Sequence, residues 1–294
     1  MSDLQTRHPD SVGLTSVCGH LLRRAQQVHN AYWLDEVGSD PTSPQYAVLA
    51  AIAATPGADQ REVSEAASLD TSTTMDIVAR LTGRGWVARE RSPSDARRDI
   101  LTPAARAVEA LTLLRTKVQR VQDRLLAPLP DEERGEFTDL LRRTARVDPQ
   151  TQGGGYSPLH IPGHLLRRAQ QVHTALFAVE FDRELTGPQY AALHVLAAHP
   201  SISQRQLGDE AALDKSTAAD LVQRLARRGW ITRERDAADG RRRVLSLSRA
   251  GEEAARGFTP RVTAVQERLM EPLDRRDRER LLALLVPVAY VAGY

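Results

Sequence analysis

The stretch LDKSTAADLVQRLARRGW, residues 213–230, predicts a helix that leads directly into a strand. Asp214 is a favourable N-cap, since its carboxylate can accept hydrogen bonds from the first free amides of a helix. The helix is expected to run through KSTAADLVQRLARR and to stop at Gly229, because glycine accommodates the backbone that ends a helix. From Trp230 onward, WITRER alternates apolar and polar residues, which predicts a half-buried strand.

The residues on either side of this stretch complete a larger motif. Before it, Ser203 followed by Gln206 is a capping signature that predicts a short helix. After it, DAADGRR at 236–242 predicts a turn, and RVLSLS at 243–248 predicts a returning strand. Two helices joined by a tight turn form a helix-turn-helix, and the following hairpin makes it a winged helix.

The whole pattern occurs twice, because HLLRRAQQVH at 20–29 recurs at 164–173 and the chain matches itself at the same shift. In the first copy Asp59 and Glu62 form the capping signature, and the next helix is expected from Asp70 to Gly85. The returning strand of the first copy, DILT, is expected to be about two residues shorter than its counterpart. Further matches are PQY (44–46 and 188–190), RGW (84–86 and 228–230), RER (89–91 and 233–235) and VQDRLLAPL (121–129) with VQERLMEPL (265–273).

The expected fold class is mostly α with small β-hairpin wings, as two tandem winged helix-turn-helix domains that form an intramolecular pseudo-dimer. Each copy begins with a helix that carries the decapeptide, followed by a helix that starts near Pro44 or Pro188. Between the copies, Pro, Gly and Gln without apolar periodicity indicate a flexible linker. The expected closing helices are 104–127 and 131–146 in the first copy and 250–271 and 275–291 in the second. The predicted domains are therefore 14–147 and 159–294, joined by a linker at 148–158.

The composition excludes several classes of protein. In 294 residues, 41% hydrophobic and 27% charged content describes a globular chain. No segment has the roughly 20 apolar residues needed to span a bilayer, and no secretory signal is present, so a cytoplasmic protein without a membrane partner is expected. A single cysteine excludes an internal disulfide framework. There is no motif of a hydrolase, a nucleotide-binding loop or a metal cluster, so neither an enzyme nor a cofactor or metal site is expected.

The winged helices predict which side chains touch double-stranded DNA. A recognition helix enters the major groove with its N-terminal residues toward the bases, and arginines on a wing tip suit the minor groove. A carboxylate two residues before a wing arginine can orient its guanidinium. The N-terminal residues are Thr71, Ser72, Thr73, Lys215, Ser216 and Thr217; phosphate contacts are expected from Arg80, Arg84, Arg224 and Arg228; the wing residues are Arg97, Arg98, Arg241 and Arg242, supported by Asp95 and Asp239.

The second copy is expected to be the stronger DNA reader. Although the whole chain has a net charge of only +2, residues 215–243 contain nine basic and four acidic residues, a net +5. Residues 71–99 contain six basic and four acidic residues, a net +2. The same asymmetry appears where Thr71 of the first copy corresponds to Lys215 of the second. An operator with unequal halves follows as a hypothesis.

The stretch 213–230, together with DAADGRRRVLSLSRAG that follows, resembles the MarR family of bacterial regulators. The resemblance covers about 14–147 and 158–291. It implies a winged-helix homodimer on a pseudo-palindromic site, dimerised through its first and last helices and usually released from DNA by a small molecule. This chain departs from the pattern by fusing two copies, so one polypeptide would supply both readers of a two-fold operator. A repressor is the expected role.

The repeated decapeptide suggests a ligand site, because all ten residues agree, whereas the recognition helices agree at seven of fourteen positions. Arg23 and His29 lie ~120° apart around one helix. These residues would suit an aromatic acid if they line one concavity. The arginine could bind the carboxylate and the histidine a phenolic hydroxyl, with amides and an aromatic ring between them. The arc between them holds Gln26, Asn30 and Trp33, and the second copy offers Arg167, Gln170, His173, Thr174 and Phe177.

The decapeptide is also similar to the first helix of MarR regulators that sense protocatechuate and related hydroxybenzoates. There an arginine and a histidine hold the ligand, which carries over to Arg23 with His29 and to Arg167 with His173. The implied partner is protocatechuate or a similar aromatic carboxylate. His20 and His164 point to another side of the helix and are weaker candidates.

Three other interpretations stay open. The decapeptide could serve only helix packing, with its histidines and arginines satisfied internally. Cys18 could sense peroxide, although the second copy has Pro162 at that position. The chain could also be a ligand-binding or protein-interaction module whose DNA binding is weak or lost.

Overall fold

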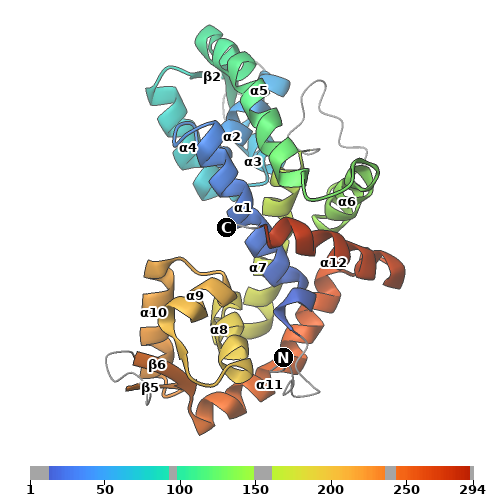
Figure 1. Ribbon diagram of the computed structural model, residues 1–294. Helices are drawn as coiled ribbons and strands as arrows, with labels where there is room; N and C mark the ends of the chain where they lie inside the picture. The colour runs from blue at the N-terminus through green and yellow to red at the C-terminus, as the bar shows by residue number, and fades with distance from the viewer. Residues whose placement is uncertain (1–12, 93–97, 149–160, 236–242, 292–294) are drawn as a thin grey trace. The chain divides into compact units, whose positions relative to one another are not determined.

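The computed structural model describes residues 13–92, 98–148, 161–235 and 243–291. The chain divides into two compact units, which combine residues of both repeats. Unit 1 contains the chain up to Arg24 and Gln170–Glu271, and unit 2 contains Ala25–Ala169 and Pro272–Tyr294. The divisions fall inside α1 (Cys18–Glu36) and α7 (Pro162–Phe181), the two helices that carry the decapeptide (Figure 1).

Unit 1 holds the winged helix of the second repeat. Helices α8, α9 and α10 pack together, and β5 and β6 form the hairpin beside α10 (Figure 1). Its core contains Phe177, Phe181 and Leu225, and all three are buried. The elements are η1 (Leu14–Ser16), α8 (Gly187–Ala198), β4 (Ile202–Ser203), α9 (Gln204–Ala211), α10 (Lys215–Arg227), β5 (Ile231–Arg235), β6 (Arg243–Leu247) and α11 (Arg249–Leu269).

Unit 2 holds the winged helix of the first repeat and the two final helices, α6 and α12, which contact each other. Leu49, Ile52 and Leu81 are fully buried in its core. The elements are α2 (Ser43–Ala54), β1 (Ala58–Asp59), α3 (Gln60–Ala67), α4 (Thr71–Gly83), β2 (Val87–Arg91), β3 (Asp99–Pro103), α5 (Ala105–Leu126), α6 (Asp131–Thr144) and α12 (Arg275–Ala289).

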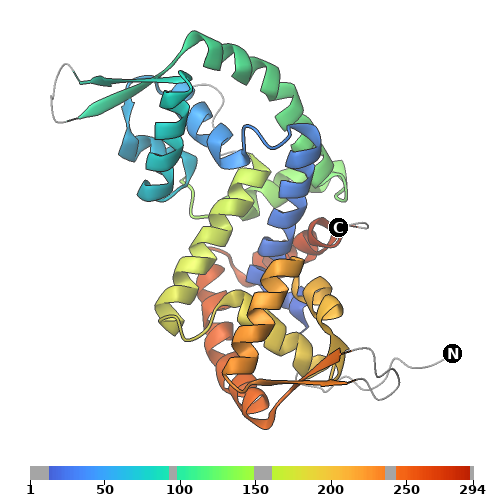
Figure 2. The same cartoon turned by 90° about the vertical axis from the view of Figure 1, so that its left-hand side faces the viewer.

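The helix-turn-helix and the wing form as the sequence predicts. Both caps are present: the carboxylates of Asp70 and Asp214 accept hydrogen bonds from the first amides of α4 and α10. The strands of each wing pair in antiparallel fashion and lie side by side in Figure 2. A third, two-residue strand that was not predicted joins each sheet, in the orders β1-β3-β2 and β4-β6-β5.

The expectation of a shorter returning strand in the first copy is wrong. Both β3 and β6 contain five residues, with the same register, because Arg91 lies opposite Asp99 as Arg235 lies opposite Arg243. The alternation of DILT ends early in the sequence, but Pro103 still pairs with Val87 at the last position of the ladder. No helix in the described part of the chain is long and apolar enough to cross a membrane.

Candidate functional site

The N-terminus of α10 presents a fixed pattern of polar groups. The hydroxyl groups of Ser216 and Thr217 donate to the Asp214 carboxylate over 2.6 and 2.5 Å, and both amides donate to the same carboxylate. These hydrogen bonds hold the pKa of Asp214 below its usual range. The hydroxyl oxygens keep lone pairs for an incoming donor, while Lys215 is exposed beside them.

The N-terminus of α4 has the same frame with less charge. Asp70 accepts from the Thr73 amide at 2.8 Å and from the Thr73 hydroxyl at 2.6 Å. The pKa of Asp70 is lowered by these hydrogen bonds, the one from the hydroxyl contributing most. Thr71 and Ser72 are exposed and carry no charge. The two recognition helices therefore differ by one cation at their first position.

Two of the arginines expected to reach phosphates are held at the C-terminal ends of these helices. Arg84 forms a bidentate ion pair with Asp40, at 2.7 and 2.8 Å, and lies over the ring of Trp86. Arg228 donates to the main-chain oxygen of Glu184 at 2.6 Å and lies over Trp230 in the same way. Arg80 and Arg224 are exposed, one turn earlier on each helix.

The wing tips are mostly outside the described residues. Asp95, Arg97, Asp239, Arg241 and Arg242 all lie there, so their expected roles stay predictions.

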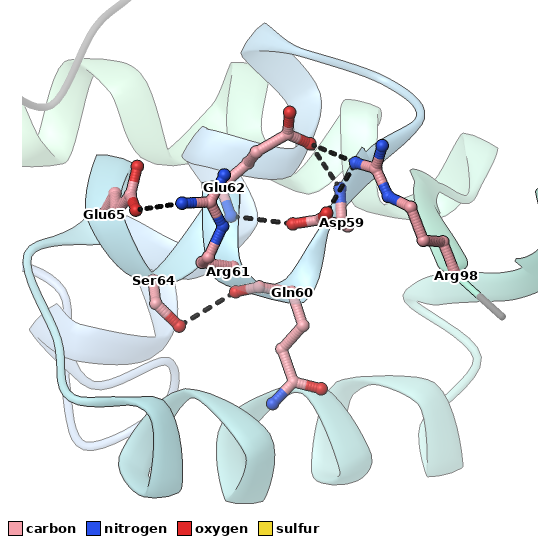
Figure 3. A network of polar contacts seen from close by, with 7 residues as sticks. All are labelled: Asp59, Gln60, Arg61, Glu62, Ser64, Glu65 and Arg98. Atoms are coloured by element: carbon pink, nitrogen blue, oxygen red, sulfur yellow. Dashed lines mark hydrogen bonds and ion pairs between the residues drawn. The ribbon is translucent and has the colours of Figure 1, made fainter. Parts of the chain in front are cut away.

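Arg98 is the one wing-tip arginine within the described ranges. It pairs with Asp59 at 2.5 Å and with Glu62 at 3.5 Å, at the start of α3 (Figure 3). The pKa of Asp59 lies below its usual range, first because the Glu62 amide donates to it and also because Arg98 is adjacent. This wing arginine is therefore tied to its own domain.

A pocket of about 540 Å³ lies within unit 1. It combines an apolar wall with polar side chains from both repeats, which is the composition of small-molecule sites. The wall includes Leu14 and Val17 before α1 and Phe177 and Tyr190 from the second repeat. Its polar lining residues include His20, Arg23, Gln170, His173, Arg224 and Gln266.

Arg23 connects this pocket to the helix-turn-helix. Its guanidinium donates to the main-chain oxygens of Ala211 and Ala212, at 2.6 and 2.7 Å, and contacts Nδ1 of His20 at 3.1 Å. Ala212 has a left-handed backbone, with φ of 52°, where α9 turns toward α10. One side chain thus lines the pocket and holds the last carbonyls of α9.

His173 is buried in the pocket wall and hydrogen-bonded. The Gly19 amide donates to Oε1 of Gln266 at 2.8 Å, so the Gln266 side-chain nitrogen is the donor to Nε2 of His173 at 3.1 Å. His173 is then neutral, with its proton on Nδ1. Burial, and to a smaller extent the charge of Arg23, lowers its pKa to about 4. Phe177 lies beside this ring, with centroids 5.5 Å apart.

Unit 2 contains the corresponding cluster of side chains. Arg167 donates to the main-chain oxygen of Ala67 at 2.8 Å and contacts Nδ1 of His164 at 2.9 Å. Its other two guanidinium nitrogens are buried and have no partner among the described residues. Burial lowers the pKa of Arg167 to about 10, and burial with the charge of Arg167 lowers that of His29 to about 4.

The remaining predicted ligand residues of the first repeat belong to this second cluster. Gln26 contacts Nδ1 of His29 at 3.3 Å and donates to Asn30 at 2.9 Å, while its Oε1 is buried without a partner in the described chain. Trp33 donates to the main-chain oxygen of Pro41 at 2.9 Å and lies 6.0 Å from the His29 ring.

The pocket of unit 1 groups these residues differently from the expected arrangement along one helix. Arg23 shares its pocket with Gln170, His173 and Phe177 of the other repeat, and not with His29 of its own helix. His29, Gln26 and Trp33 lie in unit 2 with Arg167.

Three other residues of these clusters, His20, Gln266 and Gln122, have only a weak signal or none in the sequence. His20, which was ranked as a weaker candidate, lines the pocket beside Arg23. Gln266 and its counterpart Gln122 accept the amides of Gly19 and Gly163. The matched segments 121–129 and 265–273 place these two glutamines at corresponding positions, although the match alone does not indicate their role.

Cys18 does not have the environment of a reactive thiol. It is fully buried, and burial raises its pKa to about 12, so almost no thiolate is present near neutral pH. Among the described residues, no group of three or more His, Cys, Asp or Glu side chains could hold a metal ion.

Comparison with family models matches both repeats. A family model described as MarR family matches residues 39–98 and 184–242. The chain is 36% identical over 122 residues to the transcriptional regulator HosA of Escherichia coli, covering 42% of this chain and 90% of HosA. It is 33% identical over 124 residues to the transcriptional repressor NicR of Pseudomonas putida, covering 42% of this chain and 78% of NicR.

Solved structures also match about half of the chain. The PcaV transcriptional regulator of Streptomyces coelicolor, solved with its natural ligand, is 39% identical and covers 50% of this chain and 99% of its own, with a TM-score of 0.42.

Proposed function

Since this chain belongs to the MarR family of transcriptional regulators, we propose that it is a repressor whose two winged helices bind one DNA operator and that a small aromatic acid releases it. The fused repeats would then act as an intramolecular pseudo-dimer, with one winged helix for each half of the operator.

The recognition helices support DNA binding. Their N-termini are exposed and carry hydroxyl groups at fixed positions, which suits contacts to base edges and phosphates. Lys215 adds a cation on α10, while Arg80 and Arg224 remain exposed on the same helices. Arg84 and Arg228 have a different role in this proposal: they fix the ends of the recognition helices to the rest of the domain.

The pocket chemistry supports an aromatic acid as the effector. The guanidinium of Arg23 can bind a carboxylate. The neutral ring of His173 can donate from Nδ1 to a hydroxyl oxygen, and Phe177 offers an aromatic face. Protocatechuate, or a similar hydroxybenzoate, has this combination of groups in one small molecule.

The observation that carries the proposal is the position of Arg23 between the pocket and the helix-turn-helix. In the structure, the guanidinium nitrogens of Arg23 donate to the carbonyls of Ala211 and Ala212. A ligand carboxylate that binds this guanidinium therefore competes with those carbonyls. The turn before α10 would then lose its support. A ligand that binds more tightly to this altered turn shifts the population away from the DNA-binding conformation.

The experiment is a fluorescence anisotropy titration of a labelled duplex from upstream of this protein's own gene, with and without protocatechuate. We expect binding at low salt that the ligand weakens. Binding that the ligand leaves unchanged would retain the regulator and reject the aromatic acid. No binding to any duplex from this region would favour a ligand-binding or protein-interaction module.

A further inference from the structure

The described arginines on the wing of the first repeat pair with carboxylates of their own domain. Asp99 on β3 pairs with Arg89 at 2.6 Å and with Arg91 at 3.3 Å, both on β2. Arg91 lies directly opposite Asp99 in the ladder, and Arg89 is its diagonal neighbour on the same face of the sheet. One carboxylate therefore holds both arginines of this strand.

Arg98, the third arginine in the described part of this wing, pairs with the cap of α3. Arg98 pairs with Asp59 and Glu62, as the dashed lines in Figure 3 show. These two carboxylates also form the capping box of α3, since each accepts a backbone amide of the other. They therefore both start the helix and hold the arginine.

The second repeat keeps the fold and loses all three carboxylates. Its capping box is made by Ser203 and Gln206, which satisfy the same backbone amides without charge. Position 243, which corresponds to Asp99, is an arginine in the same register. Because a neutral capping box works equally well, the fold alone does not require the acidic residues of the first repeat.

The described strands of the second wing, β5 and β6, consequently carry three arginines and one carboxylate, that of Glu234. Arg233, Arg235 and Arg243 are exposed, and no ion pair joins them to any other described residue. Arg235 and Arg243 lie directly opposite each other, an arrangement that repels and disfavours the sheet. A polyanion on this face would relieve the repulsion, and DNA phosphates supply the matching charge.

We propose that β5 and β6 form the phosphate-binding wing of this protein, while Asp99, Asp59 and Glu62 keep the wing of the first repeat from binding phosphates. This inference rests on the proposed DNA binding. The unequal charge of the two wings then comes from particular ion pairs. Asp99 and Arg243, which occupy corresponding positions, determine which wing binds phosphates.

The test exchanges the two residues in the full chain and measures operator binding by anisotropy over a range of salt concentrations. Each phosphate contact contributes about 0.9 to the slope of log K against log salt. Arg243→Asp should weaken binding at least about tenfold and reduce the slope by about 2 to 3, because the new carboxylate also neutralises its neighbours. Asp99→Arg should tighten binding and steepen the slope by a similar amount.

Two variants serve as controls. Arg275→Asp makes the same charge change on an exposed residue of α12, outside both sheets, and should leave the slope within about 0.5 of the wild-type value. Asp99→Asn removes the carboxylate that pairs with Arg89 and Arg91 without adding a cation, so it should give a smaller increase than Asp99→Arg even if the latter folds poorly.

The outcomes separate this inference from the proposed function. If the wild-type chain binds DNA but Arg243→Asp behaves like Arg275→Asp, or neither Asp99 variant steepens the slope, the inequality of the wings is wrong. If the wild-type chain binds no duplex at low salt, the proposed function is wrong, and this inference, which depends on DNA binding, is wrong as well.

Discussion

Gly19 shows how closely single residues are fitted around the buried histidines. A Cβ at this position would lie 2.2 Å from Nε2 of His173, and one at Gly163 would lie equally close to His29. The identical decapeptides predict that His29 and His173 contribute to a ligand site. The sequence could not predict that each histidine packs on the glycine before the other copy of the decapeptide, because the partners are far apart in the chain.

Gly19→Ala should therefore destabilise the protein despite the better helix propensity of alanine. The added methyl must displace His173 and break its hydrogen bond from Gln266, at a cost of about 1–3 kcal/mol. Urea denaturation measures this change in the free energy of unfolding. Gly135→Ala in α6 is the control, since nothing lies within 4 Å of its Cβ, and it should stabilise by about 0.5–1 kcal/mol. Equal stability of both variants would show that His173 is not tightly packed.

The buried histidines should make stability depend on pH. Burial lowers the pKa of His173 from 6.5 to about 4, so between these values the unfolded chain binds a proton that the folded chain does not. Stability is then complete above pH 6.5 and falls as the pH drops toward 4, by up to about 3 kcal/mol for this group.

His173→Gln should flatten this pH dependence, which urea denaturation at several pH values would measure. If His173→Gln retains the wild-type slope, the histidine is not held neutral in the fold.

At the scale of elements, capping and periodicity predicted nearly every helix. The predicted starts at Asp70 and Asp214 match the N-caps of α4 and α10. The third strands, β1 and β4, could not be predicted because two residues carry no periodicity. They exist because their backbones pair with β3 and β6, which are far away in the sequence.

The N-cap of α10 should be needed for both stability and DNA binding. Asp214→Ala removes the acceptor for the amides of Ser216 and Thr217, at a cost of about 1 kcal/mol, and releases both hydroxyl groups from their fixed positions. Thermal unfolding and operator anisotropy measure the two effects. Asp214→Asn can still cap the helix, so it should retain most of the thermal stability and most of the operator binding. If Asp214→Asn loses as much of both as Asp214→Ala, the negative charge of Asp214 is needed, and capping alone is not sufficient.

At the scale of the whole molecule, the duplication was clear from the sequence but its pairing was not. A helical wheel compares residues of one helix, so it placed Arg23 with His29. Because the repeats carry the same decapeptide, the sequence offers both pairings equally. Only the packing shows that Arg23 lines a pocket with His173, while His29 lies with Arg167.

This pairing predicts an energetic coupling between the repeats. In a double-mutant cycle for protocatechuate binding by calorimetry, Arg23→Ala and His173→Ala should be non-additive, because both residues line one pocket. Arg23→Ala and His29→Ala should be additive within about 0.5 kcal/mol. Coupling of Arg23 to His29 with none to His173 would restore the grouping along one helix and reject the composite pocket.

In the proposed function, Arg23 and Arg167 belong to the effector sites, and both also donate to main-chain oxygens of a helix-turn-helix. The most direct measurement is the operator anisotropy titration with protocatechuate on the wild type and on Arg23→Gln with Arg167→Gln. We predict that the wild type releases DNA when the ligand is added, whereas the double variant binds DNA and no longer responds. Release of the double variant at the same ligand concentration as the wild type would contradict the account.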